Sequence, residues 1–132
     1  MLCTRATGTP GEARAWIRDR LTGELRNEAI QALELIGSEL VTNAIRHTAE
    51  GAIELCVAAH SRQVRIEVSD HDPDCNAAVV PMRDDWAAGG RGLRLVEAYS
   101  ARWGCTVDGP RKIVWAELDV ASAELRDEST GS

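Results

Sequence analysis

The sequence predicts one α+β domain, a two-layer α/β sandwich whose mainly antiparallel sheet of four to five strands carries about three helices on one face. Two observations support this. Apolar residues recur at helical spacing up to Gly51, and afterwards they alternate every second residue, as in strands with one buried face. A chain of 132 residues is also the right size for a single hydrophobic core. Two layers bury both kinds of apolar surface.

Two helices are expected first. Thr9 is placed to cap the first helix, Pro10 suits its first position, and Gly23 is placed to end it. The second, longer helix runs from about Asn27 to Thr48, and its residues form a mostly apolar stripe. Gly51 stops it.

Four strands are expected after the helices. Ile53–Ala58 and Val64–Ser69 alternate between apolar and polar residues and are close enough to form an antiparallel hairpin. Arg102–Val107 and Lys112–Leu118 form a second pair around a tight turn that contains glycine and proline.

The remaining segments are predicted to form a loop, a short helix and a tail. Asp70–Gly90 has no periodicity and carries prolines, paired aspartates and paired glycines, so it is expected to be a long functional loop. Gly92–Ala101 predicts a third, short helix. We expect a single domain over residues 1–118 and a flexible tail over residues 119–132.

Composition narrows the class of protein. The net charge of -6 and the pI near 5.0 disfavour nucleic-acid binding. No apolar run of about 18 residues predicts a membrane span, and the amino terminus lacks the layout of a signal peptide. The expected location is therefore the cytoplasm. The four cysteines are widely spaced without zinc-ligand intervals, which favours reduced structural thiols.

Three polar residues of the long helix are candidates for a site. Glu39, Asn43 and His47 follow one another at steps of four, so they lie on one strip at the border of the apolar stripe. Polar groups at such a border can face a cleft. The ordinary alternative is a solvated helix edge.

Asp70 is the next candidate. It continues the alternation of Val64, Ile66 and Val68, so its carboxylate is expected to point beneath the helices. A buried charge needs a partner, and the sequence names no lysine or arginine for it. A ligand with an exocyclic amino group, such as adenine, would supply a donor. The alternative is that Asp70 only ends the strand and opens a turn.

A glycine-rich segment is the third candidate. Gly90, Arg91, Gly92 and Leu93 precede or open the predicted third helix. Glycines there let backbone amides approach a phosphate, and the start of a helix favours an anion. A flexible hinge would give the same residues.

Together these segments resemble the three ATP-site boxes of the GHKL superfamily in order and spacing. The boxes are ELVTNAIRH at 39–47, VSD at 68–70 and GRGLRLV at 90–96. The resemblance extends over about residues 13–118, including a final VWAEL strand, and is closest to the bacterial anti-sigma-factor serine kinases and their stand-alone relatives.

The resemblance implies the Bergerat ATP-binding fold, with ATP and Mg²⁺ held between the long helix, the sheet and the loop. By that analogy Asn43 holds Mg²⁺ against the triphosphate, Asp70 accepts a hydrogen bond from the adenine amino group, and Glu39 is the general base. The resemblance also assigns to the ATP site His47, Gly90, Arg91, Gly92 and Leu93.

The implied function is that of a cytoplasmic serine/threonine protein kinase. It would phosphorylate an anti-anti-sigma-like protein and so release or capture a sigma factor, without binding nucleic acid or membrane. Homodimerisation stays open. The alternative is a non-catalytic module that sequesters a sigma factor with weak or no ATP binding, because the second box, Asp70–Asp74, lacks the family's glycines. A catalytic domain separated from a histidine kinase is disfavoured, because 132 residues leave no room for a dimerisation helix pair that carries a phosphorylated histidine, and His47 lies inside the expected ATP site.

Overall fold

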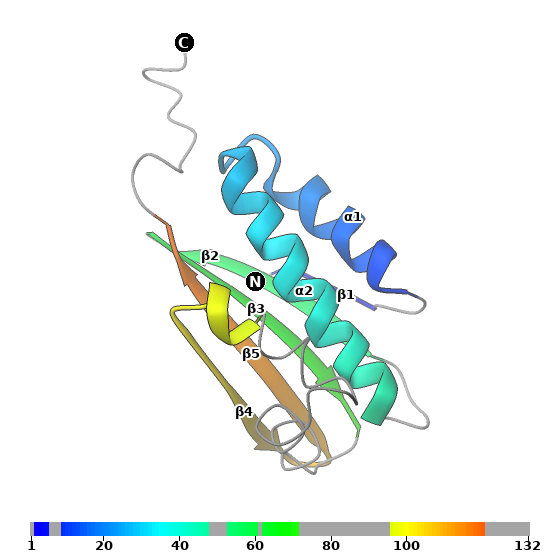
Figure 1. The fold of residues 1–132 in the computed structure, drawn as a ribbon. Helices are drawn as coiled ribbons and strands as arrows, with labels where there is room; N and C mark the ends of the chain where they lie inside the picture. Colours follow the sequence, from blue (N-terminus) through cyan, green and yellow to red (C-terminus); the bar gives the residue numbers. More distant parts are fainter. Residues whose placement is uncertain (1, 6–8, 48–52, 61, 72–95, 121–132) are drawn as a thin grey trace.

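A computed structural model describes residues 2–5, 9–47, 53–60, 62–71 and 96–120. Its elements are, in chain order, β1 Leu2–Arg5, α1 Pro10–Leu21, α2 Asn27–His47, β2 Glu54–His60, β3 Gln63–Asp70, β4 Arg102–Asp108 and β5 Arg111–Asp119. The sheet has five strands in the order β1-β2-β3-β5-β4, and every pair is antiparallel. Both helices lie on one face of the sheet (Figure 1). The predicted two-layer architecture is confirmed.

Helix α1 begins and ends where its capping residues predict. The Thr9 side chain accepts a hydrogen bond from the backbone N–H of Glu12 at 3.2 Å, and Pro10 occupies the first turn. Thr22 is the C-cap, and Gly23 follows with φ of 98°, a left-handed conformation that glycine adopts at little cost.

The two helices pack through small and branched side chains. Ile17 of α1 is fully buried, and a Cβ atom at Gly37 of α2 would collide with its Cδ1 atom. Glycine at this position therefore lets the two helices approach closely. At the edge of this contact, the Nε atom of Arg18 donates to Glu34 at 2.6 Å.

The central strands of the sheet are β3 and β5. In β3, Val64, Ile66 and Val68 are at most 1% exposed, and Val114 and Ala116 of β5 lie on the same buried face. The β4–β5 turn is closed by Gly109, which has φ of 62°. Alternation along these strands builds the core under α2, as the sequence predicts.

Three features differ from the expected elements or extend them. β1 was not expected, and it forms one edge of the sheet by pairing with β2. Residues 96–99 are helical, within the expected third helix. The packed part of the chain extends into the expected tail: β5 ends at Asp119, and Val120 after it is 3% exposed, with its N–H donating to the carbonyl of Arg62 at 2.8 Å. Most of the expected long loop and residues 121–132 of the expected tail lie outside the described residues.

The prediction of reduced cysteines is wrong for two of the four. Cys56 and Cys105 are each disulfide-bonded. Sequence spacing alone did not indicate this, because the pairing of strands brings together residues that are far apart in the chain. Cys3 of β1, for example, stands directly opposite Cys56 of β2 in the sheet register.

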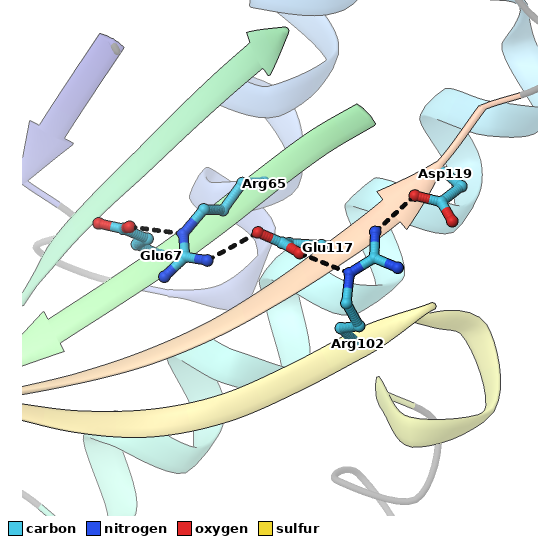
Figure 2. A network of polar contacts seen from close by, with 5 residues as sticks. All are labelled: Arg65, Glu67, Arg102, Glu117 and Asp119. Atoms are coloured by element: carbon cyan, nitrogen blue, oxygen red, sulfur yellow. Dashed lines mark hydrogen bonds and ion pairs between the residues drawn. The ribbon is translucent and has the colours of Figure 1, made fainter. Parts of the chain in front are cut away.

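The face of the sheet away from the helices carries a network of ion pairs (Figure 2). Arg65 bridges Glu67 at 2.7 Å and Glu117 at 2.8 Å, and Arg102 bridges Glu117 at 2.7 Å and Asp119 at 2.6 Å. Glu117 thus joins strands β3, β4 and β5. Hydrogen bonds from Arg102, which has the larger effect, and from Arg65 hold the pKa of Glu117 below its ordinary value of 4.5.

This network predicts a specific acid sensitivity. Because the pKa of Glu117 is lower in the folded than in the unfolded protein, its stabilising effect is complete above pH 4.5 and is lost as the pH falls through the folded-state value. Glu117→Gln is expected to flatten the decline in the free energy of unfolding below pH 4.5. At neutral pH its cost stays within about 1 kcal/mol, because the pairs are partly exposed.

The measurement is urea unfolding between neutral pH and about pH 3, the lower part of the range in which carboxylates titrate. Glu24→Gln is the control, because Glu24 is exposed and has no ion pair among the described residues. Parallel pH profiles for the wild type and Glu117→Gln would contradict the prediction.

Candidate functional site

Two polar side chains near the C-terminal end of α2 have no intramolecular partner among the described residues. The hydroxyls of Ser38 and Thr42 donate to backbone carbonyls one turn earlier in the helix. By contrast, Glu39 is half-buried and takes part in no ion pair or side-chain hydrogen bond within the described part of the chain. Asn43 lies one turn further on and is 8% exposed. The strip predicted from the sequence therefore combines an uncommitted carboxylate with a buried amide.

The environment of Asn43 suits a polar ligand. Its Nδ2 atom is buried without a hydrogen-bond partner among the described residues. A buried amide group that leaves hydrogen-bonding capacity unused calls for an explanation. Side-chain amide oxygens are ligands that Mg²⁺ accepts, together with water and phosphate oxygens. Asn43 thus offers an unused donor at Nδ2, and its amide oxygen is of the type that Mg²⁺ accepts.

Asp70 points where its strand alternation predicts. It is 1% exposed, on the same face of β3 as the core valines and beneath the helix layer. Its partner, however, was not expected. The Nζ atom of Lys112 lies 3.5 Å from Oδ2 of Asp70, and neither side chain has any exposed surface. The two residues are directly opposite each other across the β3–β5 pair.

Sequence reasoning missed Lys112, although a signal was present. Lys112 stands two residues before Val114 and four before Ala116, both of which face the core. The period of two in strands therefore places the lysine on the core face. A buried lysine without a partner is rare. The position of Lys112 in this alternation could therefore have identified it as the counterion of a buried aspartate.

Three elements that carry candidate site residues come together at one end of the molecule. The C-terminal ends of α2 and β3 and the beginning of β5 all lie there (Figure 1). Asn43 is on α2, Asp70 ends β3, and Lys112 is the second residue of β5. His47 ends α2, but its side chain lies outside the described residues, as do Gly90, Arg91, Gly92 and Leu93.

Within the described ranges, no three histidine, cysteine, aspartate or glutamate side chains are grouped to bind a metal ion. Mg²⁺ is often held by few protein ligands when a nucleotide supplies phosphate oxygens. No described helix has both the length and the apolar character needed to cross a bilayer.

Comparison with known proteins identifies the family. A family model described as "Histidine kinase-like ATPase domain" matches residues 6–117. The chain belongs to this family. It is therefore an ATP-binding domain of the GHKL type, and the match runs from before α1 into β5. No curated protein matches this ATPase domain.

Solved structures share the fold of this ATPase domain. One is the histidine kinase domain of the blue-light activated histidine kinase from Erythrobacter litoralis EL346, with 24% identity and a TM-score of 0.53 over 84% of this chain. The chain spans 59% of that structure. Another is the Acinetobacter baumannii histidine kinase AdeS, with 12% identity and a TM-score of 0.53 over 92% of this chain and 69% of that one. At these identities the likeness concerns the fold.

Proposed function

We propose that this ATPase domain is a cytoplasmic serine/threonine protein kinase that phosphorylates an anti-anti-sigma-like protein and so controls a sigma factor. The observation that carries the proposal is the environment of the Glu39 carboxylate. It is a half-buried carboxylate one helical turn from the amide of Asn43, and it has no intramolecular partner among the described residues. A domain that only binds a partner has no use for an acid held in this way.

The chemistry needs few protein groups. Phosphoryl transfer depends mainly on a metal ion, positioned donors and an oriented nucleophile. Bound MgATP would supply the phosphoryl group and the metal. Asn43 would coordinate Mg²⁺ through its amide oxygen and so set the position of the nucleotide. Glu39 would accept the proton of the serine or threonine hydroxyl of the partner protein.

The first test is magnesium-dependent ATP binding. Asn43→Ala is expected to weaken MgATP binding by about tenfold or more, because the loss of one contact worth about 1.4 kcal/mol has this effect. When EDTA removes Mg²⁺, Asn43→Ala should weaken ATP binding much less, because the amide acts through the metal. Isothermal titration calorimetry with and without Mg²⁺ measures both values.

The matched control is Gln31→Ala, which removes an exposed amide from the same helix. Its affinity for MgATP should equal that of the wild type. If the wild-type protein binds no ATP in the presence of Mg²⁺, the kinase proposal is wrong. Equal losses for Asn43→Ala with and without Mg²⁺ would contradict the role of metal ligand.

One observation favours a second candidate function, a non-catalytic module that sequesters a sigma factor. The carboxylate proposed to bind the adenine amino group already faces the buried ammonium of Lys112. The ion pair between Asp70 and Lys112 would compete with the adenine amino group for the carboxylate and so weaken nucleotide binding. The two candidates differ in transfer of labelled phosphate from ATP to a serine-containing or threonine-containing partner, which only the kinase carries out.

A further inference from the structure

Lys112 is a buried cation with unused hydrogen-bonding capacity. Its side chain has no exposed surface, and its Nζ atom has no hydrogen-bond partner among the described residues. The distance of 3.5 Å to Asp70 exceeds the roughly 2.7–2.9 Å of a charge-assisted hydrogen bond. A lysine ammonium offers three donors, and its burial is unfavourable unless acceptors meet them.

Unused donors at this point call for a ligand that brings an acceptor. Asp70, directly opposite in the sheet, supplies acceptors only, because an ionised carboxylate has no proton to donate. The pair therefore presents a donor and an acceptor side by side. A ligand edge that matches it has an acceptor next to a donor.

Purine bases differ at the position that would meet this pair. Adenine carries an amino group at carbon 6, whereas guanine and hypoxanthine carry a carbonyl oxygen there, beside a ring N–H. An adenine amino group at Asp70 would come close to the ammonium of Lys112, so that a donor would face a donor. A 6-carbonyl would instead accept from Lys112, and the neighbouring ring N–H would donate to Asp70. Lysine contacts to the guanine O6 atom are common in protein–DNA recognition.

We propose that Lys112 is a base-specificity residue of the nucleotide site, and that together with Asp70 it admits 6-oxopurine nucleotides as well as adenine nucleotides. The inference rests on the proposed nucleotide site and extends it by naming a second class of ligand. Lys112 acts on the base and not on the phosphates, so its effect appears in the ratio of two affinities.

The test compares ADP, GDP and IDP in the presence of Mg²⁺ by calorimetry. In the wild type, GDP is expected to bind at least as tightly as ADP. IDP should behave like GDP, because it shares the 6-carbonyl and the ring N–H, although it lacks the 2-amino group. Lys112→Met, which removes the charge and keeps the length, should shift the GDP-to-ADP affinity ratio toward ADP by about tenfold or more, as the loss of one charged hydrogen bond predicts.

Two further variants make the result specific. Lys112→Gln keeps a donor without the charge, so it should shift the ratio less than Lys112→Met, and it replaces that variant if the latter does not fold. Arg111→Met removes the neighbouring cation of β5, which lies on the opposite face near Glu54, and should leave the ratio unchanged.

The possible outcomes separate the inference from the function on which it rests. An unchanged GDP-to-ADP ratio in Lys112→Met, or an equal loss of all three nucleotides, would show that Lys112 is structural and would overturn the inference alone. Strong preference of the wild type for ADP over both GDP and IDP would also overturn it. Absence of any nucleotide binding by the wild type would overturn the proposed function as well.

Discussion

Asp70→Ala is expected to lower the free energy of unfolding by about 3–5 kcal/mol, because it leaves a buried lysine without its counterion. The reason is the complete burial of both partners. Lys112 has no exposed surface, so its ammonium cannot regain water without opening the contact between the sheet and α2. Urea unfolding followed by circular dichroism measures the change.

A double variant distinguishes this cause from loss of packing. Asp70→Leu combined with Lys112→Met replaces the pair with apolar groups of similar size, and such replacements are often neutral or stabilising. The double variant should therefore recover most of the stability that Asp70→Ala loses. Asp19→Ala, on the exposed side of α1, should change stability by no more than about 0.5 kcal/mol. A cost for Asp70→Ala as small as that of Asp19→Ala would mean that the pair does not stabilise the fold.

Glu39→Gln is expected to reduce phosphoryl transfer to a protein substrate by about 10²- to 10⁴-fold, the usual contribution of a general base. Glutamine keeps the size and polarity of the side chain but cannot accept the proton. Affinity for MgATP should change little, because the proposed role of Glu39 concerns the hydroxyl of the partner and not the nucleotide. Single-turnover transfer with saturating ATP isolates the chemical step.

The control for this variant is Glu28→Gln, on the exposed first turn of the same helix. Its transfer rate should match the wild type. If Glu39→Gln weakened nucleotide binding as strongly as it slowed transfer, Glu39 would belong to the binding site and not to the proton transfer step. A wild-type transfer rate in Glu39→Gln would exclude it as the base.

Much of the fold could be predicted because local patterns and packing agree in most elements. The cap at Thr9, the glycine at position 23 and the alternation in β3 each depend on neighbours within a few residues. The same alternation correctly predicted that Asp70 faces the core. These signals are local, so one sequence is enough to read them.

Features that depend on long-range pairing could not be predicted in the same way. β1 has only four residues, too few to show a clear period, and its partner strand lies beyond both helices in the chain. The disulfide state of Cys56 had no signal in the spacing of the cysteines along the chain. The ion pair of Asp70 with Lys112 likewise required the register of β3 against β5. The catalytic and ligand-binding roles of Glu39 and Asn43 stay predictions.

The position of β1 has a consequence for how the newly made protein takes shape. β1 precedes both helices in the chain, whereas β2, its partner in the described part of the sheet, is synthesised after them. During that interval the backbone N–H and C=O groups of β1 are satisfied by water. An edge strand of the finished sheet is thus made before the strand with which it pairs, and it must wait to find its place.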